Sequence, residues 1–316
     1  MDIALTTRWN AGSHLDGESM IEEILELGFS HIELGYDTRL DLVPGILTMV
    51  ESAAVQIDSV HNFCPVPMST SRGHPEIYTF ADRDLRIRDR AVRHTAETLR
   101  FAAQVGARVV VSHSGNVDMT KRTMDLLDLA ESGQLFSDEY DRILMKAQDQ
   151  REKKARKQFP LLIHCLEQLV PVIEETRVTL ALEVLPTWEA FPSEMEFERI
   201  FQHFESKYFR YWHDFGHAKI RENLGFINME RWMDRLSPHL AGMHIHDVIP
   251  PGRDHVMPPH GDIDFPKFKR FAELDVVRVI EPPPNTPGEE VQEAIRTLRE
   301  AWPASAPETE QGENRP

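Results

Sequence analysis

The stretch Arg108-Val109-Val110-Val111-Ser112-His113 decides the fold that we predict for this chain. Its three consecutive valines form a nearly continuous apolar run, which is typical of a parallel strand buried on both faces. Parallel strands need a crossover connection between them, and this connection is usually a helix. We therefore expect helices on both sides of this strand, and the same alternation in the rest of the chain.

Short β-rich runs alternate with longer helical stretches along the whole chain. Strands are predicted at residues 3–6, 30–34, 56–61, 108–113, 178–184, 209–214, 240–247 and 276–281. Helices are predicted at residues 17–27, 41–54, 82–104, 159–175, 193–204, 228–236, 266–273 and 288–302. Eight such units with right-handed crossovers close into a (β/α)8 TIM barrel, an α/β fold with a single domain. A doubly wound open sheet is the alternative, but no Gly-x-Gly-x-x-Gly turn follows an early strand.

The predicted barrel domain covers residues 1–302, with one interruption. Residues 117–158 are polar and depart from the regular repeat, so they are predicted to form a helical insertion, and the basic run at 151–157 is interpreted as a solvated helix face. Residues 62–80 contain several prolines and are predicted to form a long loop that closes over a functional site. Residues 303–316 are rich in Pro, Glu, Ser and Gly and are predicted to be a disordered tail.

Composition narrows the possible partners and the compartment. The 316 residues include 35 basic and 52 acidic side chains, a net charge of -17, which argues against nucleic acid and anionic membranes as partners. The two cysteines, Cys64 and Cys165, are far apart and do not suggest a disulfide framework. The sequence has no signal-peptide pattern at its start and no apolar run near the roughly 20 residues that span a bilayer. We expect a cytoplasmic protein; a homo-oligomer stays open.

Polar side chains occupy the ends of successive predicted strands. In a TIM barrel, the carboxyl ends of the strands meet at one face, where functional residues lie. The third to eighth strands all end in a carboxylate or an imidazole, and further histidines follow the sixth and seventh strands; these residues are His61, His113, Glu183, Asp214, His217, His244, His246, His255 and Glu281. Converging carboxylates repel one another unless a cation lies between them. We therefore predict a divalent metal ion, with Mn²⁺, Zn²⁺, Co²⁺ and Mg²⁺ all open.

The segment 211–218 combines an aromatic strand with the residues Asp-Phe-Gly-His-Ala. Alternation along the strand places Asp214 on the inner face and His213 on the outer face, toward the helices. Gly216 is expected to allow a sharp turn that brings His217 back beside Asp214. Glu33, near the end of the second strand, is a further residue that could reach the site.

These motifs resemble the xylose isomerase-like TIM-barrel superfamily, which contains sugar-phosphate isomerases and epimerases and the endonuclease IV-type enzymes (AP endonuclease family 2). The resemblance covers residues 1–302. The matching pieces are Leu-Glu183, Asp214-Phe-Gly-His217-Ala, His244-Ile-His-Asp247, Ile-Glu281-Pro and the segment 254–265. They are specific at the level of the superfamily and do not name a substrate.

The resemblance implies roles for individual residues. In the epimerases and isomerases, one metal ion is held by Glu, Asp, His and Glu, which correspond here to Glu183, Asp214, His244 and Glu281. His244 is preferred over His246 because Asp247 follows it by three residues, as in the His-x-x-Asp/Glu pattern of the family.

The endonuclease IV-type members bind additional zinc ions. His61, His113 and His255 match several of those ligand positions, and His217 matches a position that contacts either substrate or metal. The Asp-x-His pattern of these enzymes is altered, because Asp254 directly precedes His255 and Arg253 occupies the expected Asp position. This departure puts a complete three-zinc site in doubt.

The leading hypothesis is a metal-dependent isomerase or epimerase of a small sugar, sugar phosphate or polyol, in which Glu183 and Glu281 transfer a proton next to a metal-bound carbonyl. His61, His113, His217, His246 and His255 would position substrate or a second metal. Lower-ranked substrate contacts are Trp9, Phe63, Trp188 and Arg253, and the candidates for binding an anionic group are Arg8, Arg72 and Arg253.

The alternatives are a zinc-dependent hydrolase or phosphodiesterase with several metal ions and, from another class, a non-catalytic sugar-binding barrel. About one metal ion per chain favours the isomerase, and two or three favour the hydrolase.

Overall fold

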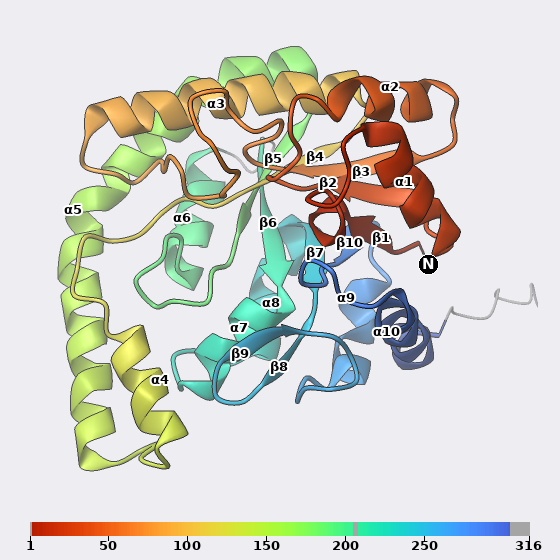
Figure 1. The fold of residues 1–316 in the computed structure, drawn as a ribbon. Helices are drawn as coiled ribbons and strands as arrows, with labels where there is room; N and C mark the ends of the chain where they lie inside the picture. Colours follow the sequence, from red (N-terminus) through yellow and green to blue (C-terminus); the bar gives the residue numbers. More distant parts are fainter. Residues whose placement is uncertain (1, 205–207, 304–316) are drawn as a thin grey trace, which may run out of the picture.

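The computed structural model describes residues 2–204 and 208–303, and most of the predicted tail at 303–316 lies outside this part of the chain. Eight parallel strands form a closed barrel in the order β1-β10-β7-β6-β5-β4-β3-β2 (Figure 1). These strands are β1 (Ala4–Thr6), β2 (His31–Leu34), β3 (Gln56–His61), β4 (Val109–Ser112), β5 (Thr179–Glu183), β6 (Phe209–Asp214), β7 (Leu240–Ile245) and β10 (Val277–Ile280). The predicted (β/α)8 barrel is confirmed.

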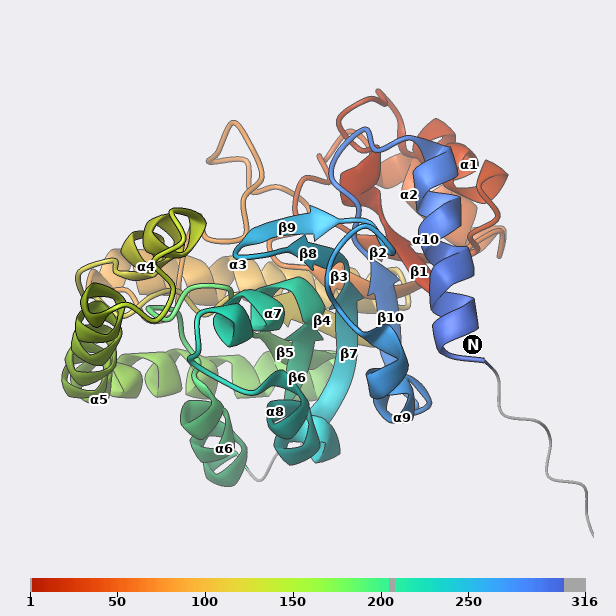
Figure 2. The ribbon, with the colours of Figure 1, turned by 90° about the horizontal axis from the view of Figure 1, so that it is seen from below.

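Helices surround the barrel on its outside (Figure 2). They are α1 (Gly17–Glu26), α2 (Val43–Glu51), α3 (Leu85–Gln104), α4 (Thr123–Glu131), α5 (Asp138–Thr176), α6 (Glu194–His203), α7 (Phe215–Asn223), α8 (Met229–Leu236), α9 (Lys269–Ala272) and α10 (Gly288–Ala301). Short 3-10 helices are η1 (Thr7–Trp9), η2 (Ser237–His239) and η3 (Phe265–Phe268). In the described part of the chain, no helix combines the length and apolarity that a membrane span requires.

The interior of the barrel is filled by side chains that lie two positions before the polar strand ends. Val111, Ala181, Trp212 and Val279 belong to one buried apolar cluster inside the barrel. Because side chains alternate along a strand, the residues two positions later point to the same side, at the mouth of the barrel. Trp212 fits because Gly242 lies beside it: a Cβ at Gly242 would lie 2.2 Å from the indole ring. The apolar layer thus forms the floor of the polar site.

Helix α5 differs from the prediction. We expected a helical insertion that ends near 158 and a separate helix from 159, but α5 runs without interruption for 39 residues. Its prolines, Pro160 and Pro171, lie on the exposed side of the helix, where solvent can hydrate the carbonyl groups that lose their helical partner. Figure 1 shows α5 extending well past the barrel, with α4 packed along it.

The basic run at 151–157 is not entirely solvated. Arg151 is buried and donates to both carboxylate oxygens of Glu196, at 3.1 and 2.8 Å. It also donates to the backbone carbonyls of Trp188 and Ala190, both at 2.7 Å. Arg156 of the same run is exposed, as expected. One member of the run therefore attaches α5 to the loop after β5.

Two elements near the site were not predicted. Helix α7 begins at Phe215, directly after β6, and Asp214 is its N-cap residue. The seventh strand ends at Ile245 rather than at 247, and an antiparallel hairpin of β8 (Asp247–Ile249) and β9 (Arg253–Val256) follows it. The hairpin returns His255 to a position against His246, with the two rings stacked 4.1 Å apart.

Candidate metal centre

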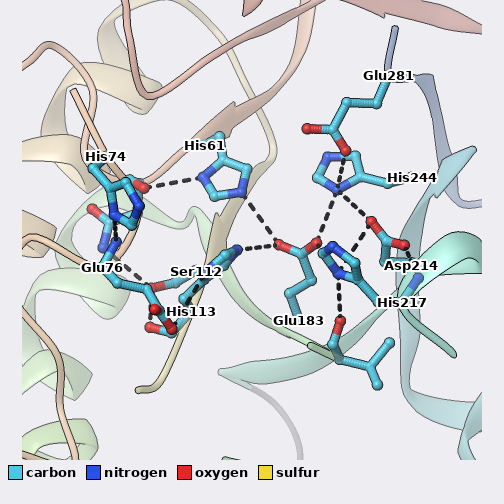
Figure 3. Close-up of polar contacts among 12 residues, drawn as sticks. His61, His74, Glu76, Ser112, His113, Glu183, Asp214, His217, His244 and Glu281 are labelled. Atoms are coloured by element: carbon cyan, nitrogen blue, oxygen red, sulfur yellow. Dashed lines mark hydrogen bonds and ion pairs between the residues drawn. The ribbon is translucent and has the colours of Figure 1, made fainter. Parts of the chain in front are cut away.

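Glu183 lies at the centre of the polar side chains that converge at the barrel mouth (Figure 3). Its Oε1 atom is 3.2 Å from Nδ1 of His244 and 3.4 Å from Nδ1 of His217. Its Oε2 atom is 3.2 Å from Nε2 of His61 and 3.1 Å from Nε2 of His113. The carboxylate is buried, so both of its oxygens meet protein groups instead of bulk water.

The first ligand group consists of Glu183, Asp214, His244 and Glu281. Nδ1 of His244 faces not only Glu183 but also Oδ2 of Asp214, at 3.8 Å, and Oε2 of Glu281, at 3.4 Å. All four side chains are buried. Three carboxylates around one imidazole nitrogen require either shared protons or a cation, and this mixed set of oxygen and nitrogen donors fits a divalent ion. The structure thus brings together the four residues that the resemblance implied.

The other nitrogen of His244 determines which atom faces this group. Nε2 lies 3.1 and 3.2 Å from the two oxygens of Glu33, and Glu33 also accepts a hydrogen bond from Ser59 at 2.8 Å. In a neutral His244, the form that can bind a cation, the Nε2 hydrogen is donated to Glu33 and Nδ1 offers its lone pair on the side of the carboxylates. A carboxylate behind a metal-binding histidine typically fixes its tautomer and its orientation. Glu33 reaches the site in this indirect role.

Replacing Glu33 by glutamine is expected to weaken metal binding about 10–100-fold, the usual cost of losing an outer partner of a histidine ligand. The neutral amide holds the imidazole less firmly and makes its nitrogen a weaker donor. Competition titration of Mn²⁺ or Zn²⁺ against a chromophoric chelator measures the change. Glu51→Gln, an exposed residue at the end of α2, is the matched control. Equal affinities in the two variants would show that Glu33 does not support the metal site.

A second group forms on the other oxygen of Glu183. His61 donates its Nδ1 hydrogen to the carbonyl of Asn62 at 3.0 Å, so its Nε2 lone pair faces Glu183. His113 presents Nε2 to the same oxygen, while its Nδ1 is 3.8 Å from Glu76. Burial lowers the pKa of His113, but the adjacent Glu183 carboxylate outweighs this and raises it to about 9. Two imidazoles and a carboxylate oxygen, all mutually within 4.8 Å, are suited to hold a second cation.

His217 lies in the first turn of α7, where its backbone N–H donates to Asp214 at 2.7 Å. Its ring Nδ1 donates to the carbonyl of Val184 at 3.0 Å, which leaves Nε2 facing Asp254 at 4.0 Å. Burial lowers the pKa of His217, but Asp214 and then Glu183 raise it to about 9. Asp254 also lies 3.4 Å from His255 Nδ1. The altered Asp-His order therefore still places a carboxylate between His217 and His255, while Arg253 is exposed.

His246 has both of its ring nitrogens engaged, one by a backbone N–H group and the other by Asp214. Nδ1 accepts the backbone N–H of His255 at 2.9 Å, so the ring hydrogen must be on Nε2, which donates to Asp214 at about 3.0 Å. By distance, His246 could share a cation with Asp214 and His217, or with His255 and Glu281. Its hydrogen bonds nevertheless support a role in orienting Asp214, with His244 as the ligand from β7.

Gly216 serves a different purpose from the one expected. We predicted a sharp turn, but the residue lies in helix α7, and a Cβ on it would be 1.9 Å from Cε1 of the buried His246 ring. The glycine is thus required because the imidazole passes directly over the helix backbone. This close approach is what allows His246 to reach Asp214.

Gly216→Ala is expected to lower the free energy of unfolding by about 1–3 kcal/mol and to weaken metal binding, because the methyl group displaces His246. Alanine is intrinsically a better helix former than glycine by up to about 1 kcal/mol, so a loss of stability must come from the clash. Denaturant unfolding and metal titration measure the two effects. Gly12→Ala, where no atom lies within 4 Å of the added carbon, is the control. A stabilised Gly216→Ala variant would contradict the expected contact.

The lower-ranked substrate residues lie in contact with other protein groups. Trp9 donates to the carbonyl of Thr286 at 2.7 Å, Phe63 packs against Tyr78, and Trp188 stacks on Phe226 with the ring centroids 4.5 Å apart. Arg253 is exposed on β9. His213 is buried and meets Phe215 edge-on, on the helix side of β6 as predicted.

A cavity of about 350 Å³ lies beside the ligand groups and shares His113 and His217 with them. Its other walls come from the loops after β2, β3, β4 and β5 and include Tyr36, Glu76, Lys121, Met124 and Thr187. These residues were not identified from the sequence. Four of them stand alone in loops and Met124 lies at the start of α4, and no spacing pattern distinguishes them from their neighbours.

A family model described as a xylose isomerase-like TIM barrel matches residues 21–301. An uncharacterised protein of Methanocaldococcus jannaschii, MJ1614, is 22% identical over 261 residues, which cover 82% of this chain and 83% of that protein.

Two solved structures share the fold. A D-tagatose 3-epimerase-like protein is 18% identical with a TM-score of 0.66, covering 95% of this chain and 97% of its own. The IolI protein with a bound zinc atom is 15% identical with a TM-score of 0.58, covering 95% and 96%. At this identity, the two likenesses concern the fold.

Proposed function

We propose that this chain, which belongs to the xylose isomerase-like TIM-barrel family, is a metal-dependent isomerase or epimerase of a small carbohydrate. The observation that carries the proposal is the position of two carboxylates, Glu183 and Glu281, which approach the same nitrogen of His244 within 3.4 Å from strands that are not neighbours. Carboxylates on two sides of one small site suit removal of a proton from one face of a carbon and its return.

The residues divide the work as follows. Glu183, Asp214, His244 and Glu281 would hold the cation, which when bound polarises a carbonyl group and acidifies the neighbouring C–H bond. Glu183 and Glu281 move the proton, a contribution of roughly 10²–10⁴-fold for positioned acids and bases. Glu33 and His246 keep His244 and Asp214 oriented through the hydrogen bonds that they make.

Several features favour a small carbohydrate as substrate. The cavity of about 350 Å³ is near the lower end of the 300–1,000 Å³ typical of ligand pockets. It is lined by hydrogen-bonding groups that suit hydroxyls, such as Glu76, His113 and Thr187. One protein with a similar fold is described as D-tagatose 3-epimerase-like, and tagatose is a sugar. The net charge of -17 disfavours a nucleic acid as substrate.

A second candidate function is a hydrolase with two or more metal ions, acting on a small phosphodiester or phosphomonoester. One observation favours it: Glu183 turns its second oxygen toward the Nε2 atoms of both His61 and His113. Glu183, His61 and His113 would hold the second cation, which together with the first would supply an activated water and stabilisation of a leaving oxygen. Asp254, between His217 and His255, provides a carboxylate for a further ion.

The test combines metal analysis with two substrate panels on the same metal-loaded preparation. Ketoses, aldoses, their phosphates and polyols are assayed for exchange of the C–H proton with deuterated water. Small phosphomonoesters and phosphodiesters are assayed for release of phosphate or alcohol. Proton exchange on a sugar, abolished by chelator and restored by a divalent ion, supports the isomerase. Ester hydrolysis without any sugar exchange would replace it with the second candidate.

A further inference from the structure

Arg8 is a charged residue at the barrel mouth that the proposed reaction has not used. It lies in η1, directly after β1, and Nη1 forms an ion pair with Oε1 of Glu281. The Arg8 side chain is 16% exposed and that of Glu281 is 4% exposed, so the pair is shielded from bulk solvent. Such a shielded, charge-assisted contact holds its geometry far better than an ion pair on the surface does.

The arginine is itself fixed by its surroundings. Its guanidinium carbon lies 4.7 Å above the centre of the Tyr36 ring. Its aliphatic stem passes Gly35, where a Cβ would be only 2.6 Å from Cγ of Arg8. The backbone N–H of Gly35 donates to the Thr7 hydroxyl at 2.8 Å, which ties this loop to the end of β1. The guanidinium is therefore positioned by packing before any ligand binds.

The ion pair makes the two catalytic carboxylates unequal. Glu183 directs both of its oxygens toward imidazoles of the ligand groups. Glu281 directs only Oε2 there, at 3.4 Å from His244, because Oε1 is held by Arg8. A carboxylate whose second oxygen is engaged in this way can offer a cation one donor atom but not two.

We propose that Arg8 is a positioning residue that restricts Glu281 to one donor atom and so keeps a coordination position free for substrate. This inference rests on the proposed metal site. Four residues that give one atom each leave about two positions on a six-coordinate ion such as Mn²⁺ or Mg²⁺. A hydroxycarbonyl substrate needs both of them. Without Arg8, Glu281 binds through both oxygens and takes one of these positions.

The test is the number of water molecules on bound Mn²⁺, measured by pulsed electron paramagnetic resonance in deuterated water. Arg8→Met keeps the stem that packs on Gly35 and removes the charged fork, and it should lose about one coordinated water relative to the wild type. Arg8→Lys keeps a cationic donor for Oε1 and should retain the wild-type number. Arg235→Met, which breaks an exposed pair with Glu194, is the control for loss of an arginine.

The outcomes separate the inference from the proposed function. If Mn²⁺ does not bind the wild-type protein at this site, the metal-dependent function fails. If it binds and Arg8→Met has the wild-type number of waters, the role of Arg8 is refuted. Loss of Mn²⁺ by a folded Arg8→Met variant would also refute it, because Arg8 would then be needed to retain the ligand. With an assayable substrate, KM should rise more in Arg8→Met than in Arg8→Lys.

Discussion

Glu183→Gln is expected to reduce turnover by roughly 10²–10⁴-fold, the contribution of a positioned acid–base group, while the fold remains intact. Glutamine has the shape of glutamate but no negative charge, and its amide nitrogen accepts no proton. It would also leave the imidazoles of His61, His113 and His244 without the anion that they face. Metal binding should therefore fall together with kcat. Steady-state kinetics and metal analysis of the purified variant measure the two effects.

The matched control is Glu175→Gln, an exposed carboxylate at the end of α5 that pairs with Arg100 on the surface. It should have wild-type turnover and metal content. Glu281→Gln tests the second proton-transfer residue with the same assays. Near-normal activity of both Glu183→Gln and Glu281→Gln, with circular dichroism unchanged, would exclude these two residues as the acid and base.

Arg151→Met is expected to lower the free energy of unfolding by about 3–5 kcal/mol, the cost of removing one partner of a buried ion pair. The side chains of Arg151 and Glu196 are 6% and 8% exposed, so Glu196 would be left as a largely buried, uncompensated charge. The carbonyls of Trp188 and Ala190 would also lose their donors. Trp188 and Ala190 lie in the loop after β5, which also forms part of the cavity wall, so we expect the variant to have a less ordered cavity wall as well. Equilibrium unfolding in urea gives the magnitude.

Arg156→Met is the appropriate comparison, since Arg156 belongs to the same basic run of α5 but faces solvent. Arg156→Met should change the free energy of unfolding by no more than about 0.5 kcal/mol, as most surface substitutions do. A similar, small change in both variants would mean that the buried pair adds little to stability. In that case, α5 would be held to the barrel mainly by its apolar face.

The barrel was predictable because each repeat carries its own local signal. Buried parallel strands are apolar runs, and the helices between them have the helical spacing of apolar residues, so neither depends on distant parts of the chain. The differences between the predicted and the observed helices also have physical causes. We expected a boundary between two helices near residue 158, but α5 continues through Pro160, which lies on its exposed side. Helix α7 was missed because Asp214-Phe-Gly-His resembles a turn, whereas Asp214 acts as an N-cap.

The ligand residues were predictable for a topological reason: in a closed barrel, the ends of successive strands meet at one mouth. What the sequence does not contain is the orientation of each ring. Whether His246 or His244 offers a free nitrogen depends on hydrogen bonds to the backbone of His255 and to Glu33. Glu33 is on β2, which is not a neighbour of β7 in the sheet, so the contact is made across the barrel. Arg8 and Glu281 are 273 residues apart, and no local pattern links them.

The shared position of Glu183 has a thermodynamic consequence. Its two oxygens belong to different ligand groups, so a cation on one oxygen alters the charge and the orientation that the other oxygen offers to a second cation. Such coupling is reciprocal: whatever the first ion does to the affinity of the second, the second does equally to the first. Where both groups take up a cation, the two ions should therefore bind in steps rather than independently. The ratio of the stepwise binding constants in a Zn²⁺ titration then measures how strongly Glu183 couples the two ligand groups.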